Sequence, residues 1–260
     1  MFRMPISGIE VELRQATGHE DLLLLEGHGD RVSTSMELVE RLASPRPGEK
    51  LNAAELTVAD LEALLLELRR RIIGETIATR GRCPKPDCAT PIDVSFGIGD
   101  YLRGHSTRKP SNVETIESDS QWFQVRGSEI QFRLVTVGDL VAAAELPAPE
   151  FELARRTIRT PMQELSKHGQ KKAERAMESL APPLSGEIEG QCPECGTRVS
   201  FWFDVQSYVQ RELRYDAEFL YEDVHQLATK YHWSEEKILS LPRQRRMQYV
   251  ELALQRRGGS

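Results

Sequence analysis

The chain has 260 residues, of which 28% are charged and 39% hydrophobic, and its formal net charge is −6. This length provides for one or two domains with a sizeable core, and the negative charge argues against a large nucleic-acid footprint. No apolar run reaches the roughly 18–20 residues of a membrane helix. The N-terminal stretch also lacks the apolar core of a signal peptide, so we expect a cytoplasmic protein without membrane association.

Two stretches near the start and the middle of the chain match each other. Residues 8–20 (GIEVELRQATGHE) align without gaps on residues 127–139 (GSEIQFRLVTVGD). Apolar residues alternate in both, which predicts a half-buried strand. Each stretch ends in Thr-x-x-acid, a spacing that suits a helix start because the threonine caps an orphan amide and the acid lies in the positive first turn. The two predicted helix starts are Thr17 with Glu20 and Thr136 with Asp139.

Helical sequence follows each predicted strand. In the first copy, Thr57 with Asp60 predicts a helix start, and a leucine-rich face follows. Residues 151–180 of the second copy are more polar and Pro161 interrupts them, which leaves either a surface free for a partner or a flexible segment. Residues 43–52 predict a loop, and the polar, aperiodic stretch 103–121 predicts a linker. The predicted leucine-rich face consists of Leu61, Leu64, Leu65, Leu68 and Ile72.

The four cysteines fall into two close pairs, each followed by a strand-like run. Residues 81–96 (GRCPKPDCATPIDVSF) resemble residues 190–205 (GQCPECGTRVSFWFDV), with Pro after the first cysteine in both. Flanking strands would place each pair at the tip of a hairpin, and two related hairpins about a pseudo-two-fold axis would bring four sulfurs together. We therefore predict one structural Zn²⁺ shared between the copies, which ties them together. The predicted ligands are Cys83, Cys88, Cys192 and Cys195.

Other roles for the cysteines make different demands on the sequence. A thioredoxin-type redox pair opens a helix, whereas a strand pattern follows Cys195. A second alternative is a metal site in which another chain completes each half-site. Catalytic zinc usually has His or Glu ligands and an open position, but the six histidines are scattered and form none of the common zinc-enzyme motifs. No other catalytic motif is present, so we expect no enzyme activity.

The C-terminal residues predict a small helical module. Ser234 is a good helix N-cap, and Pro242 ends one short helix or starts the next. Trp233 is either an interaction anchor or the core of this module. Three small helices bury little by themselves, so we expect the module to dock on the rest of the chain or on a partner.

Two surfaces of this module follow from the residue pattern. The apolar stripe of its first helix is Leu220, Val224, Leu227 and Tyr231, and that of its last helix is Met247, Val250 and Leu254. A group of arginines gives a basic end, which is either a solvated helix face or a nucleic-acid contact. These arginines are Arg243, Arg245, Arg246, Arg256 and Arg257.

The elements together predict an α+β fold. A unit of strand, helices and zinc-knuckle hairpin is present twice about a pseudo-two-fold axis, and the small helical module follows. We expect a first repeat over residues 1–102, a linker over 103–121, a second repeat over 122–213 and the module over 214–260.

The first copy also resembles a known family. The Leu-Arg-x-x-Thr-Gly-x-Glu start at Leu13–Glu20, the helix that ends near Gly74, and the cysteine turn that enters a strand are similar to the baseplate hub assembly proteins of contractile-tailed, T-even-type phages and of phage-derived contractile injection systems. The match covers residues 8–102, the second copy repeats it weakly, and the stretch YHWSEEKILSLPRQRRMQYVE is similar to short tail-assembly modules.

This resemblance implies a non-enzymatic, zinc-containing assembly chaperone or minor baseplate component whose partners are tail or baseplate proteins. It also implies incorporation into a phage-tail-like particle. The first cysteine pair departs from the tighter knuckle expected, because four residues separate its cysteines. The alternative is a zinc-ribbon nucleic-acid-binding or regulatory module. The oligomeric state does not follow from the sequence.

Overall fold

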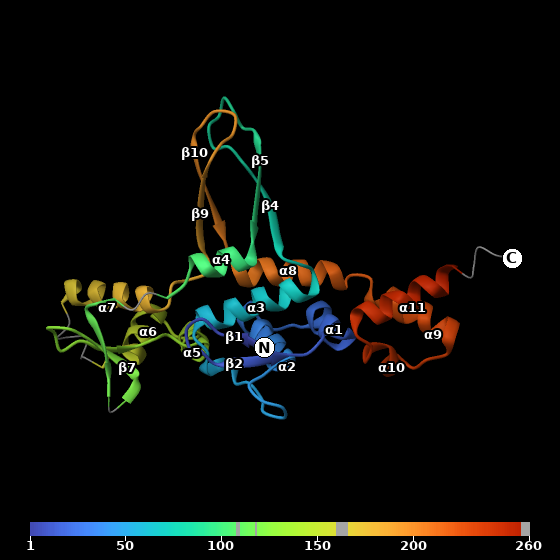
Figure 1. Ribbon diagram of the computed structural model, residues 1–260, viewed down its shortest axis with the longest axis horizontal. Helices are drawn as coiled ribbons and strands as arrows, with labels where there is room; N and C mark the ends of the chain where they lie inside the picture. Colours follow the sequence, from blue (N-terminus) through green and yellow to red (C-terminus); the bar gives the residue numbers. More distant parts are fainter. Residues whose placement is uncertain (108–109, 118, 160–165, 256–260) are drawn as a thin grey trace. The chain divides into compact units, whose positions relative to one another are not determined.

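The computed structural model describes residues 1–107, 110–117, 119–159 and 166–255 (Figure 1). Helices and small antiparallel sheets make up these residues, and the last of them are helical, so the predicted α+β class is confirmed. In the described part of the chain, no helix has both the length and the apolar character to cross a membrane. The chain forms two compact units: a terminal unit of Met1–Phe2, Val11–Leu51 and Gln206–Ser260, and a central unit of Arg3–Glu10 and Asn52–Val205.

The first part of the terminal unit is a small sheet with two helices. Strand β2 (Glu10–Leu13) pairs antiparallel with β3 (Ala43–Ser44), and the sheet order is β1-β2-β3, with β1 at Phe2–Arg3. Between β2 and β3 lie α1 (Gly18–Glu26) and α2 (Arg31–Leu42). Thr17 is the N-cap of α1, and its amide donates to the Glu20 carboxylate at 2.9 Å. The predicted helix start at Thr17 is therefore confirmed.

The second part of the terminal unit consists of α8 (Val205–Ala217), α9 (Leu220–Tyr231), α10 (Glu235–Leu239) and α11 (Arg243–Gln255). Ser234 caps α10 as predicted, because its hydroxyl accepts from the Lys237 amide. The Trp233 ring lies 5.0 Å from the ring centroids of both Tyr231 and Tyr249. Of its two predicted roles, Trp233 therefore shows the packing role within the module.

Helix α11 differs from the prediction. The predicted stripe of Met247, Val250 and Leu254 is not its buried face, since Met247 is 52% and Leu254 46% exposed. The buried residues of α11 are Arg243, Arg246 and Ala253. The apolar pattern predicted that Met247 and Leu254 face inward. Arg243 and Arg246 are buried instead, because charged partners elsewhere in the unit stabilise them.

Those partners are three aspartates that are distant in sequence. Arg246 donates to Asp21 at 2.5 Å and to Asp223 at 3.0 Å, and Arg243 donates to Asp21 and Asp216. Desolvated charges remain inside a fold only when they are paired and hydrogen-bonded. The prediction of a solvated basic face is therefore wrong for Arg243 and Arg246. Of the other predicted arginines, Arg245 is exposed, and Arg256 and Arg257 lie outside the described residues.

The central unit is organised around α3 (Val58–Ile72), which follows a short 3₁₀ turn, η1 (Ala53–Glu55). Thr57 caps α3 as predicted by accepting from the Asp60 amide at 3.1 Å. The Asp60 carboxylate instead accepts from the amides of Ile6 (2.8 Å) and Ser7 (3.0 Å), which holds the N-terminal segment of this unit on α3. The leucines of the predicted apolar face, Leu61, Leu64, Leu65 and Leu68, are all buried.

A three-stranded sheet with three helices forms another part of the central unit. The strands β6 (Val113–Ile116), β7 (Asp119–Val125) and β8 (Gln131–Arg133) pair in the order β6-β7-β8. Helices α5 (Val137–Ala144), α6 (Pro149–Thr157) and α7 (Lys167–Leu180) follow, and α7 packs its alanines against the sheet's buried residues. Thr136 caps α5, so the second predicted helix start is also confirmed.

Part of the predicted linker at 103–121 is strand. Residues of this stretch form β6 and the beginning of β7, and Val113 is buried opposite Val125. A four-residue strand with a single buried position is too short to give a periodic signal, which is why the sequence indicated a linker. Pro161, the predicted helix interruption, lies outside the described residues.

Two β-hairpins complete the central unit. Strands β4 (Thr76–Arg82) and β5 (Pro91–Gly97) pair antiparallel, as do β9 (Gly186–Gln191) and β10 (Arg198–Phe203), and α4 (Ile98–Gly104) follows β5. The two hairpins run side by side (Figure 1). Gly81 lies opposite Ile92 in one hairpin, and Gly190 opposite Val199 in the other. These are the pairs that the sequence alignment matches, although the duplication and the division into four segments stay predictions.

Candidate metal centre

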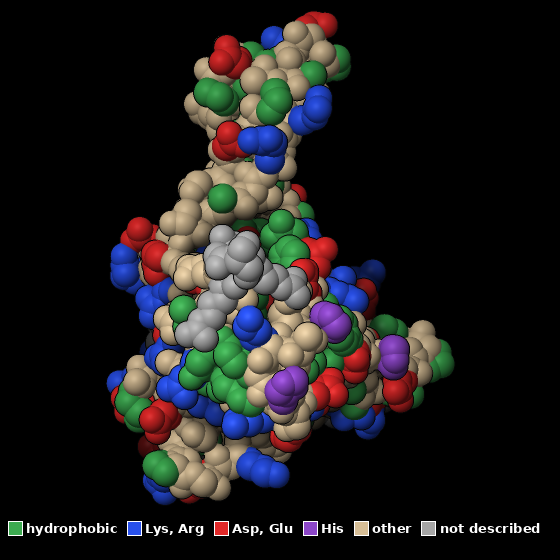
Figure 2. Space-filling view, turned by 90° about the vertical axis from the view of Figure 1, so that its right-hand side faces the viewer, with side chains coloured by type: hydrophobic (Ala, Val, Ile, Leu, Met, Phe, Trp, Pro, Cys, Tyr) green, Lys and Arg blue, Asp and Glu red, His purple; other side chains and the backbone are tan. Residues whose placement is uncertain are grey.

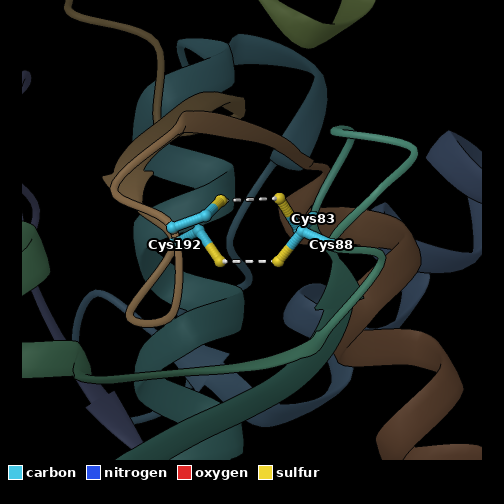
Figure 3. Close-up of side chains that lie close together, drawn as sticks. Cys83, Cys88 and Cys192 are labelled. Carbon is cyan, nitrogen blue, oxygen red and sulfur yellow. Dashed lines mark hydrogen bonds between the residues drawn. The ribbon is translucent and has the colours of Figure 1, made fainter.

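The tips of the two hairpins bring all four cysteines together. Cys83 follows β4 and Cys192 follows β9, so each hairpin contributes one cysteine from the end of a strand and one from its turn. The sulfur of Cys83 lies 3.6 Å from that of Cys195, and the sulfur of Cys88 lies 3.8 Å from that of Cys192 (Figure 3). All four sulfurs are within 4.8 Å of one another. Among the described residues, no other group of His, Cys, Asp or Glu has such an arrangement.

The sulfur arrangement fits a tetrahedral metal ion. Zinc–thiolate bonds of about 2.3 Å place the sulfurs of a regular tetrahedron about 3.8 Å apart. The two measured cross-hairpin distances are close to this value, and the four cysteines are all free. A set of four thiolates, without histidine or carboxylate, is typical of closed structural zinc sites and leaves no open position for water or substrate.

The hydrogen bonds around the sulfurs are the same in the two turns. The Cys83 amide donates to the Thr90 carbonyl and the Cys192 amide to the Thr197 carbonyl, each at 2.9 Å. The hydroxyls of the same threonines lie 3.2 Å from the sulfurs of Cys88 and Cys195. Each turn therefore orients its second cysteine through the threonine two residues later.

These contacts also affect the protonation of the thiols. Hydrogen bonds from the Thr197 hydroxyl and amide lower the pKa of Cys195 to about 6, and Thr90 lowers the pKa of Cys88 in the same way. A backbone hydrogen bond from Lys85 acts to lower the pKa of Cys83, but burial and the neighbouring sulfurs outweigh it and raise that pKa to about 12. Without a cation, four close sulfurs cannot all carry a negative charge, whereas a bound divalent ion would stabilise all four thiolates.

The two turns differ in length and in the type of residue that follows the second cysteine. Four residues separate Cys83 from Cys88, and two separate Cys192 from Cys195. The residue after the second cysteine has a positive φ in both turns, +68° at Gly196 and +44° at Ala89. Glycine adopts this conformation freely and alanine does not, so Ala89 is a strained position.

A small apolar cluster lies beneath the sulfurs. Ile92 and Val199 are buried with Cys83 and Cys192, and the Phe201 ring packs against this cluster. A Cβ at Gly81 would lie 1.8 Å from the Phe201 ring, so only glycine lets β10 approach β4 this closely. The surface of the hairpins carries charged and hydrophobic side chains (Figure 2), with ion pairs such as Arg80–Asp93 at 2.8 Å.

Aromatic rings join the two hairpins at their other end. Phe96 and Phe203, which the alignment treats as equivalent, contact each other edge to face with ring centroids 5.4 Å apart. Tyr101 packs on both rings, and its hydroxyl donates to the Leu184 carbonyl at 2.5 Å. Burial, together with the negative charge of Glu62, raises the pKa of Tyr101 to about 12, so this hydroxyl stays protonated as a donor.

Sequence reasoning identified the four cysteines but missed the residues that support them. The sequence alignment pairs Thr90 with Thr197. The only feature of the sequence that indicates their contact with sulfur is that each follows a cysteine by two residues. Gly81 was also matched with Gly190, but its close approach to Phe201 depends on a strand 120 residues later. Such contacts follow from how the hairpins pack rather than from spacing.

Comparison with known proteins gives the family of the chain. A family model described as T4 bacteriophage base plate protein matches residues 1–208, which include both hairpins and all four cysteines. No curated protein and no solved structure matches the chain. Because the family model covers well over half of the chain, the protein belongs to the T4 bacteriophage base plate protein family, and its role is structural or assembly-related in a phage baseplate.

Proposed function

We propose that the protein is a non-enzymatic, zinc-containing assembly chaperone or minor component of a contractile phage-like tail or injection-system baseplate. Family membership over residues 1–208 is the observation that carries this proposal. The four-sulfur site supports a structural role, because a closed thiolate site holds chain segments together and offers no position for a substrate. The protein then acts by contacts with tail and baseplate proteins, either only during assembly as a chaperone or also in the particle as a minor component.

The zinc part of the proposal rests on the geometry of one chain. Both hairpins of a single chain supply the four sulfurs, so one Zn²⁺ per chain is the expected content. Elemental analysis of protein purified without chelator measures this directly. A second check replaces the metal by Co²⁺, whose visible spectrum reports tetrahedral thiolate coordination. Protein that folds normally and holds less than a tenth of an equivalent of any metal would refute the zinc site.

The assembly part is tested on the particle in its own cells. We expect the chain to co-purify with baseplate intermediates, and mass spectrometry of intermediates and finished particles then separates the two forms of the proposal. A chaperone is present only in intermediates, whereas a minor component is also present in finished particles. If the chain associates with no stage of assembly, the proposal fails.

The alternative of a nucleic-acid-binding module receives no support from the described arginines of the C-terminus. Arg243 and Arg246 are buried and paired with aspartates. Of the predicted arginines that the structure describes, Arg245 is the exposed one. Phosphate contacts need exposed cations and give a steep salt dependence. A mobility-shift assay at low salt with DNA and RNA tests this alternative, and a salt-sensitive shift would favour it over the assembly role.

A further inference from the structure

Helix α11 has buried arginines on its inner side and a half-exposed apolar stripe directly beside them. Arg243 and Arg246 are on the buried face, where they are 8% and 2% exposed. Met247, Val250 and Leu254 follow helical spacing directly beside these arginines, and Met247 and Leu254 are about half exposed. An apolar stripe of this kind usually faces the core of a small helical module, and here it does not.

The buried ion pairs fix this orientation of α11. Arg246 contacts Asp21 of α1 and Asp223 of α9, and Arg243 contacts Asp21 and Asp216. Turning the apolar stripe inward would expose or unpair these charges, which is strongly unfavourable. The uncovered stripe is therefore a stable feature of the terminal unit.

Met247 and Val250 of this stripe line a groove. Phe219 and Leu220, at the junction of α8 and α9, line the same groove as Met247 and Val250. Phe219 is 60% exposed, and the groove has a volume of about 200 Å³. Pockets for cofactors and small ligands have about 300–1,000 Å³, so this groove is suited to a few side chains of a protein partner.

The charges around the groove are predominantly acidic. Asp216, Asp223 and Glu251 line it together with Arg243 and Arg246, and both arginines are already engaged by aspartates. Exposed Glu251 lies on the same helix face as Met247 and Leu254, so a negative charge borders the apolar stripe. A partner that fits this groove carries apolar side chains flanked by Lys or Arg.

We propose that the groove between the α8–α9 junction and α11 binds a basic amphipathic helix of another baseplate-assembly protein. Apolar side chains of that helix, at i, i+3, i+4 and i+7, would contact Phe219 and Met247, and its Lys or Arg would lie beside Glu251. The inference rests on the proposed assembly function and names the surface that serves it. The surface lies outside the residues 1–208 that the family model matches, except for its supporting contact at Asp21.

The test uses the full-length protein and a designed probe, a fluorescent Leu/Lys amphipathic helix of about 18 residues, which is long enough to be helical. Its comparison peptides have the Leu residues replaced by Ser or the Lys residues by Glu. We expect fluorescence anisotropy to show binding of the Leu/Lys helix, with at least tenfold weaker binding of both comparison peptides. Met247→Asp and Phe219→Asp should each weaken binding tenfold or more.

Leu252→Asp is the matched control, because Leu252 is 51% exposed on the same helix but does not line the groove. Equal losses for Leu252→Asp and Met247→Asp would overturn the proposal, since binding would then not depend on the side chains that line the groove. Circular dichroism confirms that each variant is folded. A wild-type dimer in sedimentation that Met247→Asp converts to monomer would also overturn it, because a second copy would then occupy the groove.

Particle incorporation separates failure of this inference from failure of the proposed function. If Met247→Asp enters baseplate intermediates as well as the wild type does, the groove proposal fails and the assembly function stands. If the wild-type chain enters no intermediate, the assembly function fails whatever the peptide result. Loss of incorporation for Met247→Asp, with incorporation retained for Leu252→Asp, supports both.

Discussion

The two cysteine turns have the same hydrogen-bond frame but different lengths. Both hold the first cysteine through a threonine carbonyl and the second through the same threonine's hydroxyl. The turn from Cys83 to Cys88 nevertheless contains two more residues than the turn from Cys192 to Cys195. The positions of the sulfurs and of the supporting threonine are therefore the same in both turns, while the chain between the cysteines varies in length.

The two segments that lead from a strand into a capped helix also share their hydrogen bonds and differ in the length of the acidic side chain. Arg14 pairs with Glu20 in the terminal unit, and Arg133 pairs with Asp139 in the central unit, each at 2.6 Å. Gly8 and Gly127, at the start of the matched stretches, both have φ of +69°. One acid is longer than the other by a methylene, yet each accepts from its capping threonine's amide. These parallels support the duplication that the sequence predicts.

Removing one cysteine from each turn should have the largest effect. Structural zinc supplies about 10–16 kcal/mol to zinc-finger peptides, so losing one of four ligands should cost roughly 3 kcal/mol or more for Cys88→Ser and for Cys192→Ser. A shared site predicts equal losses and a double variant scarcely worse than either single variant. Thermal unfolding followed by circular dichroism, with and without chelator, measures this. Additive losses would mean that the two turns are stabilised independently.

Gly81 and Gly190 occupy matched positions, but only Gly81 is crowded. Gly81→Ala should destabilise the protein by about 1–3 kcal/mol, because the new methyl group collides with the Phe201 ring. Gly190→Ala is the control, since its nearest neighbour would be Val199 at 3.7 Å, an ordinary contact. Urea unfolding compares the two variants. Equal destabilisation would show that the hairpins do not pack as closely as described.

The two capping acids should make stability depend on pH in the same direction. Burial acts to raise the pKa of Glu20 and of Asp139, but hydrogen bonds from Arg14 and Arg133 and from the capping threonines outweigh it and lower both values. A lowered pKa contributes stability above the ordinary carboxyl range, and this contribution is lost as the pH falls through the lowered pKa. Glu20→Gln and Asp139→Asn should each cost about 1–2 kcal/mol at pH 7.

The measurement for these variants is urea unfolding between pH 7 and pH 2. The difference between each variant and the wild type should shrink as the pH falls and vanish once the carboxyl is protonated in the folded state. A difference that stays constant down to pH 2 would contradict an ionised, hydrogen-bonded acid at that cap. Similar curves for both variants would strengthen the match between the two copies.

The smallest effect is expected at the residue after the second cysteine. Ala89→Gly should stabilise the protein by at most about 0.5 kcal/mol, because it relieves the positive φ while adding freedom to the unfolded chain. Gly196→Ala should cost about 1–2 kcal/mol, since it introduces the strain that Ala89 already has. Differential scanning calorimetry of both variants in zinc-containing buffer checks the opposite signs. Equal signs would show that the longer turn does not resemble the shorter one.

Local patterns in the sequence predicted much of this fold. Thr17, Thr57, Thr136 and Ser234 were each placed correctly as helix caps, because capping depends on residues within one turn. The alternation around the cysteines likewise predicted both hairpins. The meeting of the four sulfurs followed from recognising that the two hairpins are related, which is long-range information carried by a repeat.

Long-range contacts between residues that do not belong to the repeated segments could not be predicted from the sequence. The burial of Arg246 depends on Asp21, which is 225 residues earlier, and no local pattern indicates that pair. The apolar stripe of α11 therefore indicated the wrong inward face. Asp60 was expected in a capping role, but its carboxylate binds the amides of a segment more than 50 residues earlier. In each case a charged group is buried because distant partners satisfy it, and hydrophobic periodicity does not report such pairs.

The separation of the two hairpins along the chain has a consequence for synthesis. Cys88 and Cys192 are 104 residues apart, so the first cysteine pair leaves the ribosome well before its counterpart. At about 5–20 residues per second, the delay is roughly 5–20 s. During this interval the first hairpin has only half of the sulfurs and lacks the Phe201 ring that covers Gly81. Completion of the central unit therefore waits for its last strand, and a nascent chain released before that strand lacks half of the sulfur cluster.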